Sequence, residues 1–186
     1  MNTATAVSTY IFGIVVVVLI GLAIRRMLRG WEGRARRQAD LIGELPPLPD
    51  RLSAAVAGPT RGLYVGSTLA PDWLERVVVG DLGDRSKAVI TGYPEGILLD
   101  RRGATPIWVP QASVIVVRAE RGLAGKVVPG AGSAAGGGIL VIRWRLPSGT
   151  EIDSGFRGDA PRDYSTWIQS RQTQQTQQTQ QKGDPT

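Results

Sequence analysis

The chain begins with a long run of apolar positions. No charged side chain occurs in the first 24 residues, and residues 10–24 read YIFGIVVVVLIGLAI. A bilayer span needs about 20 mostly apolar residues, and residues 4–24 supply that length. Because lipid leaves every backbone polar group to be paired within its own segment, residues 1–24 are predicted to form a single transmembrane helix.

Two other interpretations of this run fit less well. A cleaved signal peptide has a basic n-region and a small-residue cleavage site, whereas this run has no charged side chain before it and ends directly in Arg25 and Arg26. A helix buried in a soluble core is rarely followed by so dense a basic cluster. A retained membrane anchor is therefore the favoured interpretation.

The orientation of the anchor follows from its basic flank. Six arginines lie just after the apolar run: Arg25, Arg26, Arg29, Arg34, Arg36 and Arg37. The positive-inside bias places this side in the cytoplasm, so we expect the N-terminus outside the plasma (inner) membrane and the rest of the chain inside. The same arginines suit binding of anionic lipid, at about 1 kcal/mol each. Setting the topology alone explains them equally well.

Residues 25–59 are expected to form a basic juxtamembrane helix and a proline-rich linker. Residues 31–45 are polar and compatible with a helix, and residues 45–49 read LPPLP. Consecutive prolines favour an extended polyproline II conformation. The linker is therefore predicted to be a stiff spacer that lifts a domain off the membrane.

Residues 60–170 change to short apolar runs separated by turn residues. Strands are predicted over residues 62–69, 74–79, 87–91, 96–100, 107–109, 113–119, 139–146 and 150–156. Closely spaced strands with no long helix between them favour an antiparallel sandwich or barrel.

One hairpin can be assigned a register. A three-residue loop over residues 147–149, with Gly149 in the left-handed conformation, fixes the pairing of the two flanking strands. The predicted pairs are Arg145 with Glu151, Trp144 with Ile152 and Arg143 with Asp153. One face then carries opposite charges and the other is apolar, as cross-strand pairing prefers. The two carboxylates are thereby predicted to be solvent-facing partners of arginines rather than a catalytic pair.

The end of the β region is predicted to be closed by a short helix. Residues 161–170 read PRDYSTWIQS, in which Tyr164, Trp167 and Ile168 have the spacing of one apolar stripe. Such a stripe is most simply buried against an open end of the β structure, as a cap. Residues 171–186 carry a Thr-Gln-Gln repeat. That tail is of low complexity and is predicted to be disordered.

Residues 120–138 are rich in glycine and raise the question of a phosphate site. Gly125 and Lys126 match part of a P-loop, but the first glycine and the Ser/Thr of that motif are missing, and a strand rather than a helix follows. We interpret the segment as a flexible loop between strands. Gly122, Gly125 and Lys126 are its candidate interaction residues.

Composition excludes several kinds of chemistry. The chain has 22 Lys and Arg against 16 Asp and Glu, for a net charge of +6, and it has no Cys and no His. Disulfides, Cys- or His-ligated metals, thiol nucleophiles and His-dependent bases are therefore absent. No catalytic residue, cofactor or metal is predicted. Nucleic acid is not an expected partner, because half of the net charge lies within residues 25–44 and no basic–aromatic platform accompanies the rest.

Three short segments, YPEGILL (93–99), ERGLAGKV (120–127) and DSGFR (153–157), resemble a family of small actinobacterial single-pass membrane proteins. Members carry a pleckstrin-homology-like (PH-like) domain, are often labelled export, transporter or membrane proteins, and tend to be encoded beside pyrimidine-synthesis genes. The resemblance covers residues 5–170. It implies a barrel of seven strands in two sheets, with a C-terminal helix capping one end and Trp167 as its plug. Residues 67–72 (STLAPD) lack the basic side chains with which lipid-binding PH domains hold headgroups.

These observations lead to one functional hypothesis and two alternatives. The first is a non-catalytic cytoplasmic interaction module, anchored in the bilayer, whose protein partner is an unknown membrane or cytoplasmic protein. The second is an accessory subunit of a transport or export system, which would need a polytopic partner because one span forms no path. The third is an anionic-lipid sensor that uses the basic flank together with Arg101 and Arg102.

Overall fold

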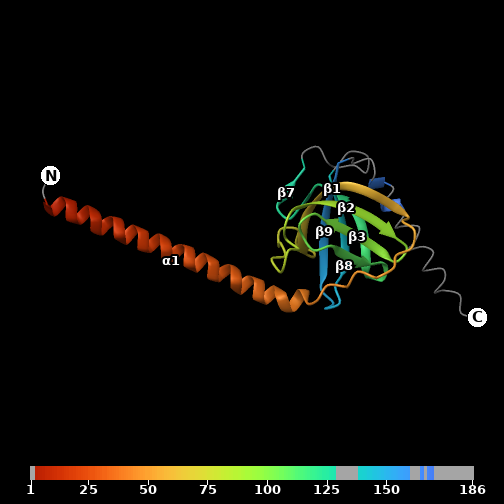
Figure 1. Cartoon of the computed structure of the whole chain (residues 1–186), viewed down its shortest axis with the longest axis horizontal. Coiled ribbons are helices and arrows are strands. Elements are labelled where there is room, and N and C mark those ends of the chain that lie inside the picture. The colour runs from red at the N-terminus through yellow and green to blue at the C-terminus, as the bar shows by residue number, and fades with distance from the viewer. Residues whose placement is uncertain (1–2, 129–137, 160–163, 166, 170–186) are drawn as a thin grey trace, which may run out of the picture.

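The computed structural model describes residues 3–128, 138–159, 164–165 and 167–169. One long helix, α1 (Thr3–Ile42), leads into a β domain (Figure 1). At about 1.5 Å per residue, its 40 residues span about 60 Å. The helix ends where Gly43 adopts a φ of +62° and donates its N–H to the carbonyl of Ala39 at 2.9 Å. Glycine tolerates this left-handed conformation, which satisfies one of the terminal carbonyls.

Seven strands of the β domain form one antiparallel sheet in the order β4-β3-β2-β1-β9-β8-β5. The strands are β1 (Ala57–Leu69), β2 (Ser86–Tyr93), β3 (Gly96–Arg101), β4 (Ile107–Pro110), β5 (Val114–Glu120), β8 (Ile139–Arg145) and β9 (Glu151–Gly158). A 3-10 turn, η1 (Gln111–Ser113), joins β4 to β5. Two further strands, β6 (Gly122–Leu123) and β7 (Lys126–Val127), form a separate hairpin.

The long strand β1 serves both halves of the sheet. It pairs with β2 from Ala57 to Tyr64 and with β9 from Gly62 to Leu69, and the pairing with β9 shifts register between Tyr64 and Gly66. Such a bulge bends and twists a strand, so one strand can turn the sheet around a core. The two sheets that the resemblance implied are therefore one continuous, bent sheet.

The enclosed face of the sheet holds the main hydrophobic core. Its largest fully buried side chains are Trp144, Trp167, Tyr64, Tyr164 and Phe156. Trp144 and Phe156 come from neighbouring strands, whereas the two residues near the C-terminus come from a helical segment over residues 164–165 and 167–169. The predicted fold class is confirmed: an apolar N-terminal helix, seven antiparallel strands and a short C-terminal helix.

The predicted hairpin register is also confirmed. Arg143, Trp144 and Arg145 pair with Asp153, Ile152 and Glu151, and Gly149 has a φ of +88°. One detail was wrong. Asp153 is 1% exposed rather than solvent-facing, because two arginine side chains fold over it.

The strand predicted over residues 74–79 is wrong. The segment belongs to the connection between β1 and β2 and makes only an isolated bridge, between Thr68 and Arg76. Its apolar pattern has another cause: Val77 is buried in the main core, whereas Leu74 is 58% exposed. We call residues 70–85 the β1–β2 loop.

The proline-rich linker does not separate the helix from the domain. Ile42, the last residue of α1, is 1% exposed and belongs to the main core, and Leu45 packs against the same core. The prolines at 46, 47 and 49 therefore follow a helix that has already reached the β domain, and the spacer prediction is wrong. The domain predicted over residues 60–170 therefore begins earlier, at the end of α1 that packs into the core.

Candidate functional site

The end of α1 is fixed to the β domain by polar contacts as well as by Ile42. Gln38, 3% exposed, donates its side-chain amide to the Arg76 carbonyl at 3.3 Å and accepts the Val78 N–H at 2.8 Å. The Ser148 hydroxyl donates to the Leu41 carbonyl at 2.5 Å. We call this set the helix junction. It joins the end of α1 to two separate loops of the β domain.

The β1–β2 loop that receives α1 is held from its other side by the Arg76 guanidinium. This group donates to the carbonyl of Gly83 and, at 3.0 Å, to that of Ala124 in the β6–β7 turn. The Ala124 N–H in turn donates to the Trp73 carbonyl at 2.8 Å. The helix junction, the β1–β2 loop and the β6–β7 hairpin are therefore connected contact by contact.

A buried guanidinium supports the same loop from beneath. The Arg101 guanidinium donates to the carboxylate of Asp81 at 2.5 Å and to the backbone carbonyl of Asp81 at 2.8 Å. The guanidinium carbon lies 4.8 Å from the Tyr64 ring centroid. Burial opposes the charge on Asp81, but the Thr105 N–H and the Arg101 guanidinium lower its pKa on balance. Arg101 is 3% exposed. It is therefore a structural cation, and its predicted contact with lipid headgroups is wrong.

Tyr64 is the centre of a buried hydroxyl network. Its phenol donates to the Leu82 carbonyl at 2.7 Å and lies 2.7 Å from the Ser67 hydroxyl, which is 2.7 Å from that of Ser154. The Trp144 indole N–H completes the network by donating to Ser154 at 3.0 Å. Burial raises the pKa of Tyr64 to about 12. The phenol is therefore a neutral structural donor.

The candidate interaction residues at 122, 125 and 126 lie in the β6–β7 hairpin rather than in a flexible loop. Ala124 and Gly125 have φ values of +52° and +71°, as the two central residues of a type I′ turn require. Leu123 packs on the outer face of the sheet in a small second core. A Cβ on Gly155 would lie 2.5 Å from Leu123 Cδ2, so glycine leaves the space for this contact.

The hairpin presents a defined surface rather than a phosphate loop. Gly125, Lys126 and Val127 are exposed, and Gly122 is half-buried. A side chain at Gly122 would meet the Lys126 carbonyl at 2.7 Å, which explains glycine at that strand position. The rest of the predicted glycine-rich loop, residues 129–137, lies outside the described residues, as does the tail over residues 171–186.

Beside the hairpin, on the outer face of β5, β8 and β9, lies a charged cluster centred on Asp153. Arg143 and Arg118 each donate to both of its carboxylate oxygens, at 2.8–2.9 Å and at 2.8–3.4 Å. Burial opposes the charge on Asp153, but the bonds from Arg143 and Arg118 lower its pKa on balance. Glu120 pairs with the same Arg118 at 2.8 Å, and Glu151 pairs with Arg145 at 2.8 Å. The cluster is balanced and leaves no carboxylate free for acid–base work.

The predicted capping residues are found in the main core. Tyr164 accepts the Gly158 N–H at 2.8 Å, and the Trp167 indole donates to the Thr60 hydroxyl at 3.2 Å. Both side chains are 1% exposed, and Ile168 is partly buried against the same core. These contacts place the C-terminal helix at the start of β1 and the end of β9.

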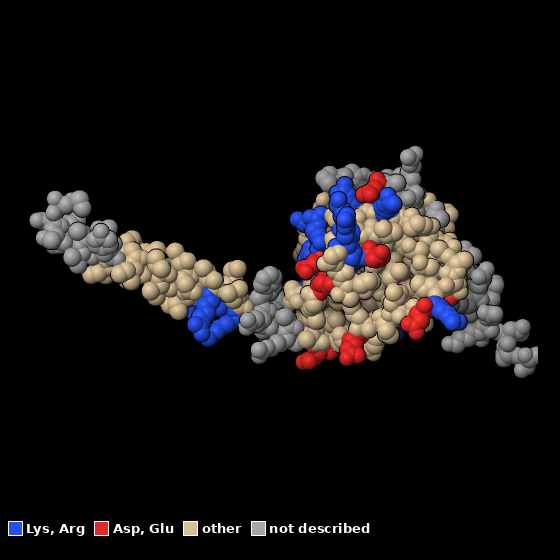
Figure 2. Space-filling view, in the orientation of Figure 1, with Lys and Arg blue, Asp and Glu red and all other residues tan. Residues whose placement is uncertain are grey.

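The basic residues of the flank all lie on α1. Arg25, Arg26 and Arg29 are exposed and form the basic group on the helix in Figure 2. Arg34, Arg36 and Arg37 lie further along the same helix, in a stretch whose side chains are not described. The residues Ile11–Arg29 of α1 are long and apolar enough to cross a membrane, and none of that stretch is buried.

A hollow surface lies on the outer face of β1, β2 and β3. It is an open groove of about 650 Å³. The charged residues that line it are Arg61, Lys87, Asp100, Arg102 and Asp159. Leu63 and Val89 supply its apolar part. Mixed charge around an apolar strip suits a protein segment better than a small anion. Within the described part of the chain, no group of three or more metal-ligating side chains occurs.

A seven-stranded antiparallel sheet closed by a C-terminal helix is the framework of PH-like domains. The family model for bacterial PH domain-like proteins matches residues 42–172. The chain belongs to this bacterial PH domain-like family. No curated protein matches it. PH-like domains are generally non-catalytic interaction modules. The match begins at the last residue of α1, which agrees with the burial of Ile42 in the β-domain core.

Sequence reasoning missed the residues that connect α1 to the domain. Gln38 and Arg76 are 38 positions apart, and Arg101 and Asp81 are 20 apart. No local pattern links such residues. One clue was present for Leu123, an apolar residue within a glycine-rich stretch, because an isolated apolar side chain in a loop often packs onto the body of the domain.

Proposed function

We propose that this protein is a single-pass, membrane-anchored interaction module whose PH-like domain lies in the cytoplasm and binds a protein partner without catalysing a reaction. The observation that carries the proposal is the contrast within α1. Its first part exposes an apolar surface that only lipid covers well, and its last turn belongs to the β domain. The helix therefore serves both as an anchor and as a rigid stalk.

The outer surfaces of the domain support binding rather than catalysis. The buried carboxylate of Asp153 is occupied by two arginines, Arg118 and Arg143. The groove over β1–β3 combines apolar floor residues with both signs of charge. A protein segment that carries complementary charges gains orientation and specificity from such a rim. The positive charge after the apolar stretch supports an N-out topology.

Anchoring is tested on the full chain in cell membranes. The protein should remain in the pellet after alkaline carbonate extraction, because a spanning helix resists treatment that releases peripheral proteins. Release into the supernatant, or an N-terminus trimmed within residues 1–30 by mass spectrometry, would contradict the anchor.

Topology is tested with single cysteines, since the native chain has none. A membrane-impermeant maleimide should label Thr3→Cys in intact cells and Lys87→Cys only after permeabilisation. The reverse pattern would place the PH-like domain outside. Lys87 is suitable because its side chain is exposed on β2.

Partner binding by the groove is tested by in vivo photocrosslinking. A photoreactive residue at Val89, in the groove, should yield a discrete adduct that Lys87→Glu with Arg102→Glu weakens several-fold. The same residue at exposed Asp50, outside the groove, is the matched control. Equal adducts at both positions would remove the groove from the proposal.

A further inference from the structure

Three large apolar side chains are exposed together where the β1–β2 loop meets the β6–β7 hairpin. Trp73 is 44% exposed, Leu74 58% and Val127 64%. The loop and the hairpin are held against each other, because the Ala124 N–H donates to the Trp73 carbonyl at 2.8 Å and Arg76 donates to the Ala124 carbonyl at 3.0 Å. We call Trp73, Leu74 and Val127 the apolar tip.

The exposure of the tip is built into the loop. Asp72 accepts the Leu74 N–H at 2.8 Å through its side chain, which fixes a tight turn at this point. The Leu69 N–H donates to the Glu75 carbonyl at 2.9 Å and closes the base of the turn. A turn that is fixed at its base and centre holds its apolar side chains outward rather than letting them fold back onto the domain.

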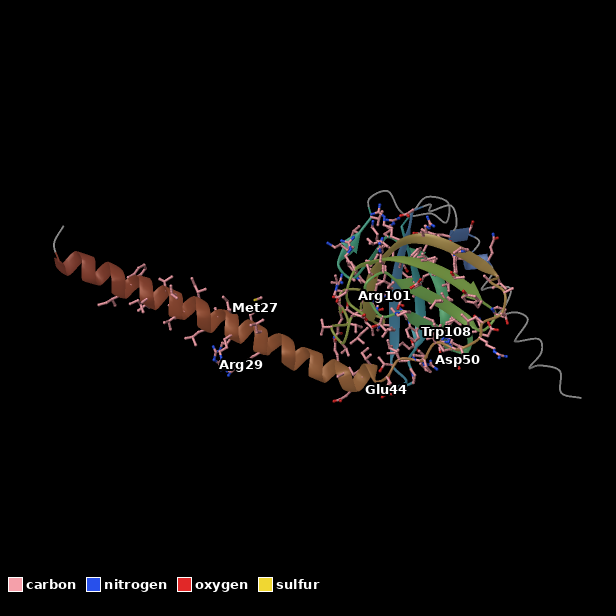
Figure 3. All side chains as sticks on the ribbon, viewed as in Figure 1. Met27, Arg29, Glu44, Asp50, Arg101 and Trp108 are labelled. Atoms are coloured by element: carbon pink, nitrogen blue, oxygen red, sulfur yellow. The ribbon has the colours of Figure 1, made fainter. Side chains whose placement is uncertain are left out.

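The tip has a defined place relative to α1. The β1–β2 loop is bonded to Gln38 of α1 through the Arg76 carbonyl and the Val78 N–H. Figure 1 shows the yellow-green β1–β2 loop and β7 on the left of the β domain, which is the side that faces the N-terminal part of α1. In Figure 3 the labelled Met27 and Arg29 lie along α1 on this same side, whereas Asp50 lies on the far side of the junction.

The distance along α1 restricts which parts of the domain can reach a bilayer. From Leu28, at the end of the apolar stretch, to Gln38 the helix rises about 15 Å, and the headgroup layer is about 5–7 Å thick. The junction itself therefore lies beyond the headgroups. Only parts of the domain that extend back along α1 toward its N-terminus can touch the headgroups. A helix tilt of about 20°, typical of membrane spans, brings one side of the domain closer to the bilayer surface.

The chemistry of the tip matches a membrane surface. Tryptophan favours the headgroup level because its ring is apolar and its N–H is polar. Exposed Arg121 and Lys126 flank the tip and suit anionic lipids, and exposed Asp72 and Glu75 are the acidic residues beside it. Because α1 tethers the domain, even a weak contact is favoured by the high effective concentration of lipid.

We propose that the apolar tip inserts into the headgroup layer of the bilayer that α1 crosses, so that the PH-like domain lies against the membrane in one orientation. This inference rests on the proposed anchor. It assigns the partner of the β1–β2 loop and β6–β7 hairpin as the lipid surface, and it leaves the groove over β1–β3 turned toward the cytoplasm and accessible to a protein.

The test uses the full chain in vesicles of equal parts phosphatidylcholine and phosphatidylglycerol. Single cysteines at Ile20, Leu74, Val127 and Asp50 carry an environment-sensitive fluorophore, and spin-labelled lipids with the nitroxide near the headgroup or deep in the chain act as quenchers. We expect deep quenching at position 20, shallow quenching at positions 74 and 127, and none at position 50. With the probe at 127, Trp73→Ser should reduce shallow quenching several-fold, whereas Leu48→Ser, an exposed control in the linker, should not.

The outcomes separate this inference from the anchor. Deep quenching at position 20 with positions 74 and 127 resembling position 50 would overturn the tip contact and leave the anchor intact. A blue-shifted but unquenched probe at 74 would show that protein rather than lipid covers the tip, and would also overturn it. Failure of quenching at position 20 would contradict the proposed function itself.

Discussion

The two ends of α1 are the same regular helix in opposite surroundings. Between Ile11 and Leu28 its large apolar side chains other than Val16 are about half exposed or more, whereas Gln38 and Ile42 at the other end are at most 3% exposed. The backbone hydrogen bonds of a helix do not depend on what covers its side chains. One end of α1 therefore belongs to the β domain, whereas the apolar side chains of the other end must be covered by something outside it.

The largest expected effect comes from breaking the buried end. Ile42→Ala removes core side chain from the helix junction and should lower the free energy of unfolding of the β domain by about 2–4 kcal/mol. The neighbouring Leu41→Ala, at a side chain 49% exposed, should change it by less than about 0.5 kcal/mol. Urea unfolding of the full chain in detergent, followed by tryptophan fluorescence, measures both. Equal effects would mean that α1 is not part of the domain.

The exposed end should respond to charge instead. Ile20→Arg places a cation near the centre of the apolar stretch and should disfavour membrane insertion by about 3 kcal/mol. Leu41→Arg, beyond that stretch, should leave insertion unchanged. The fraction that resists carbonate extraction reports the difference. If the two variants are retained equally, the apolar end of α1 does not lie in lipid.

Alkaline pH tests the loop that receives the buried end. The Tyr64 phenol, which holds that loop at Leu82, ionises near pH 10 in an unfolded chain and with a pKa of about 12 in the folded one. Between pH 10 and pH 12 the unfolded state binds fewer protons than the folded state. The phenol therefore contributes its full stabilisation below pH 10, and the free energy of unfolding falls by about 1.4 kcal/mol per pH unit up to pH 12.

Tyr64→Phe isolates this term. The variant is less stable at neutral pH, because the Leu82 carbonyl and the Ser67 hydroxyl lose their partner, but its stability should fall less steeply above pH 10. Urea titrations of both chains from pH 9 to 11.5 measure the two slopes. Parallel slopes would contradict a buried, neutral phenol.

A smaller effect is expected from Gln38→Ala. The change leaves the Val78 N–H without its acceptor at the junction and should lower stability by about 1–2 kcal/mol. Asp40→Ala, on the exposed side of the same turn, is the matched control and should change it by less than about 0.5 kcal/mol. Amide exchange measured by mass spectrometry should also rise in residues 74–79 of the first variant. Unchanged exchange there would mean that Gln38 does not hold the loop.

Local patterns in the sequence were sufficient for the regular elements. The pairing of Arg143 with Asp153 follows from a tight turn and strict alternation, and the burial of Trp167 follows from one helical stripe. The burial of Asp153 could not be predicted from the same local pattern, because Arg118 reaches it from β5, 35 positions away. Alternation gives the face on which a residue lies but not what covers that face.

The β1–β2 loop and the proline-rich linker show a second limit. The apolar run over residues 74–79 resembles a strand, yet Val77 is buried by packing while its neighbours support a turn and the helix junction. Likewise, consecutive prolines predict a stiff segment but not where the preceding helix ends. Ile42 reaches the core before the prolines begin. Long-range packing decides both cases, and local propensity carries no information about it.

The contacts of Gln38 and Ile42 imply that α1 enters the PH-like domain without a hinge. Spin labels at Leu28→Cys on α1 and Lys87→Cys on β2, in the full chain reconstituted in lipid nanodiscs, test it by electron–electron double resonance. One narrow distance distribution is expected, which broadens when Gln38→Ala and Ile42→Ala are added. A broad distribution in the otherwise native chain would show that the helix and the domain move independently and would contradict the account.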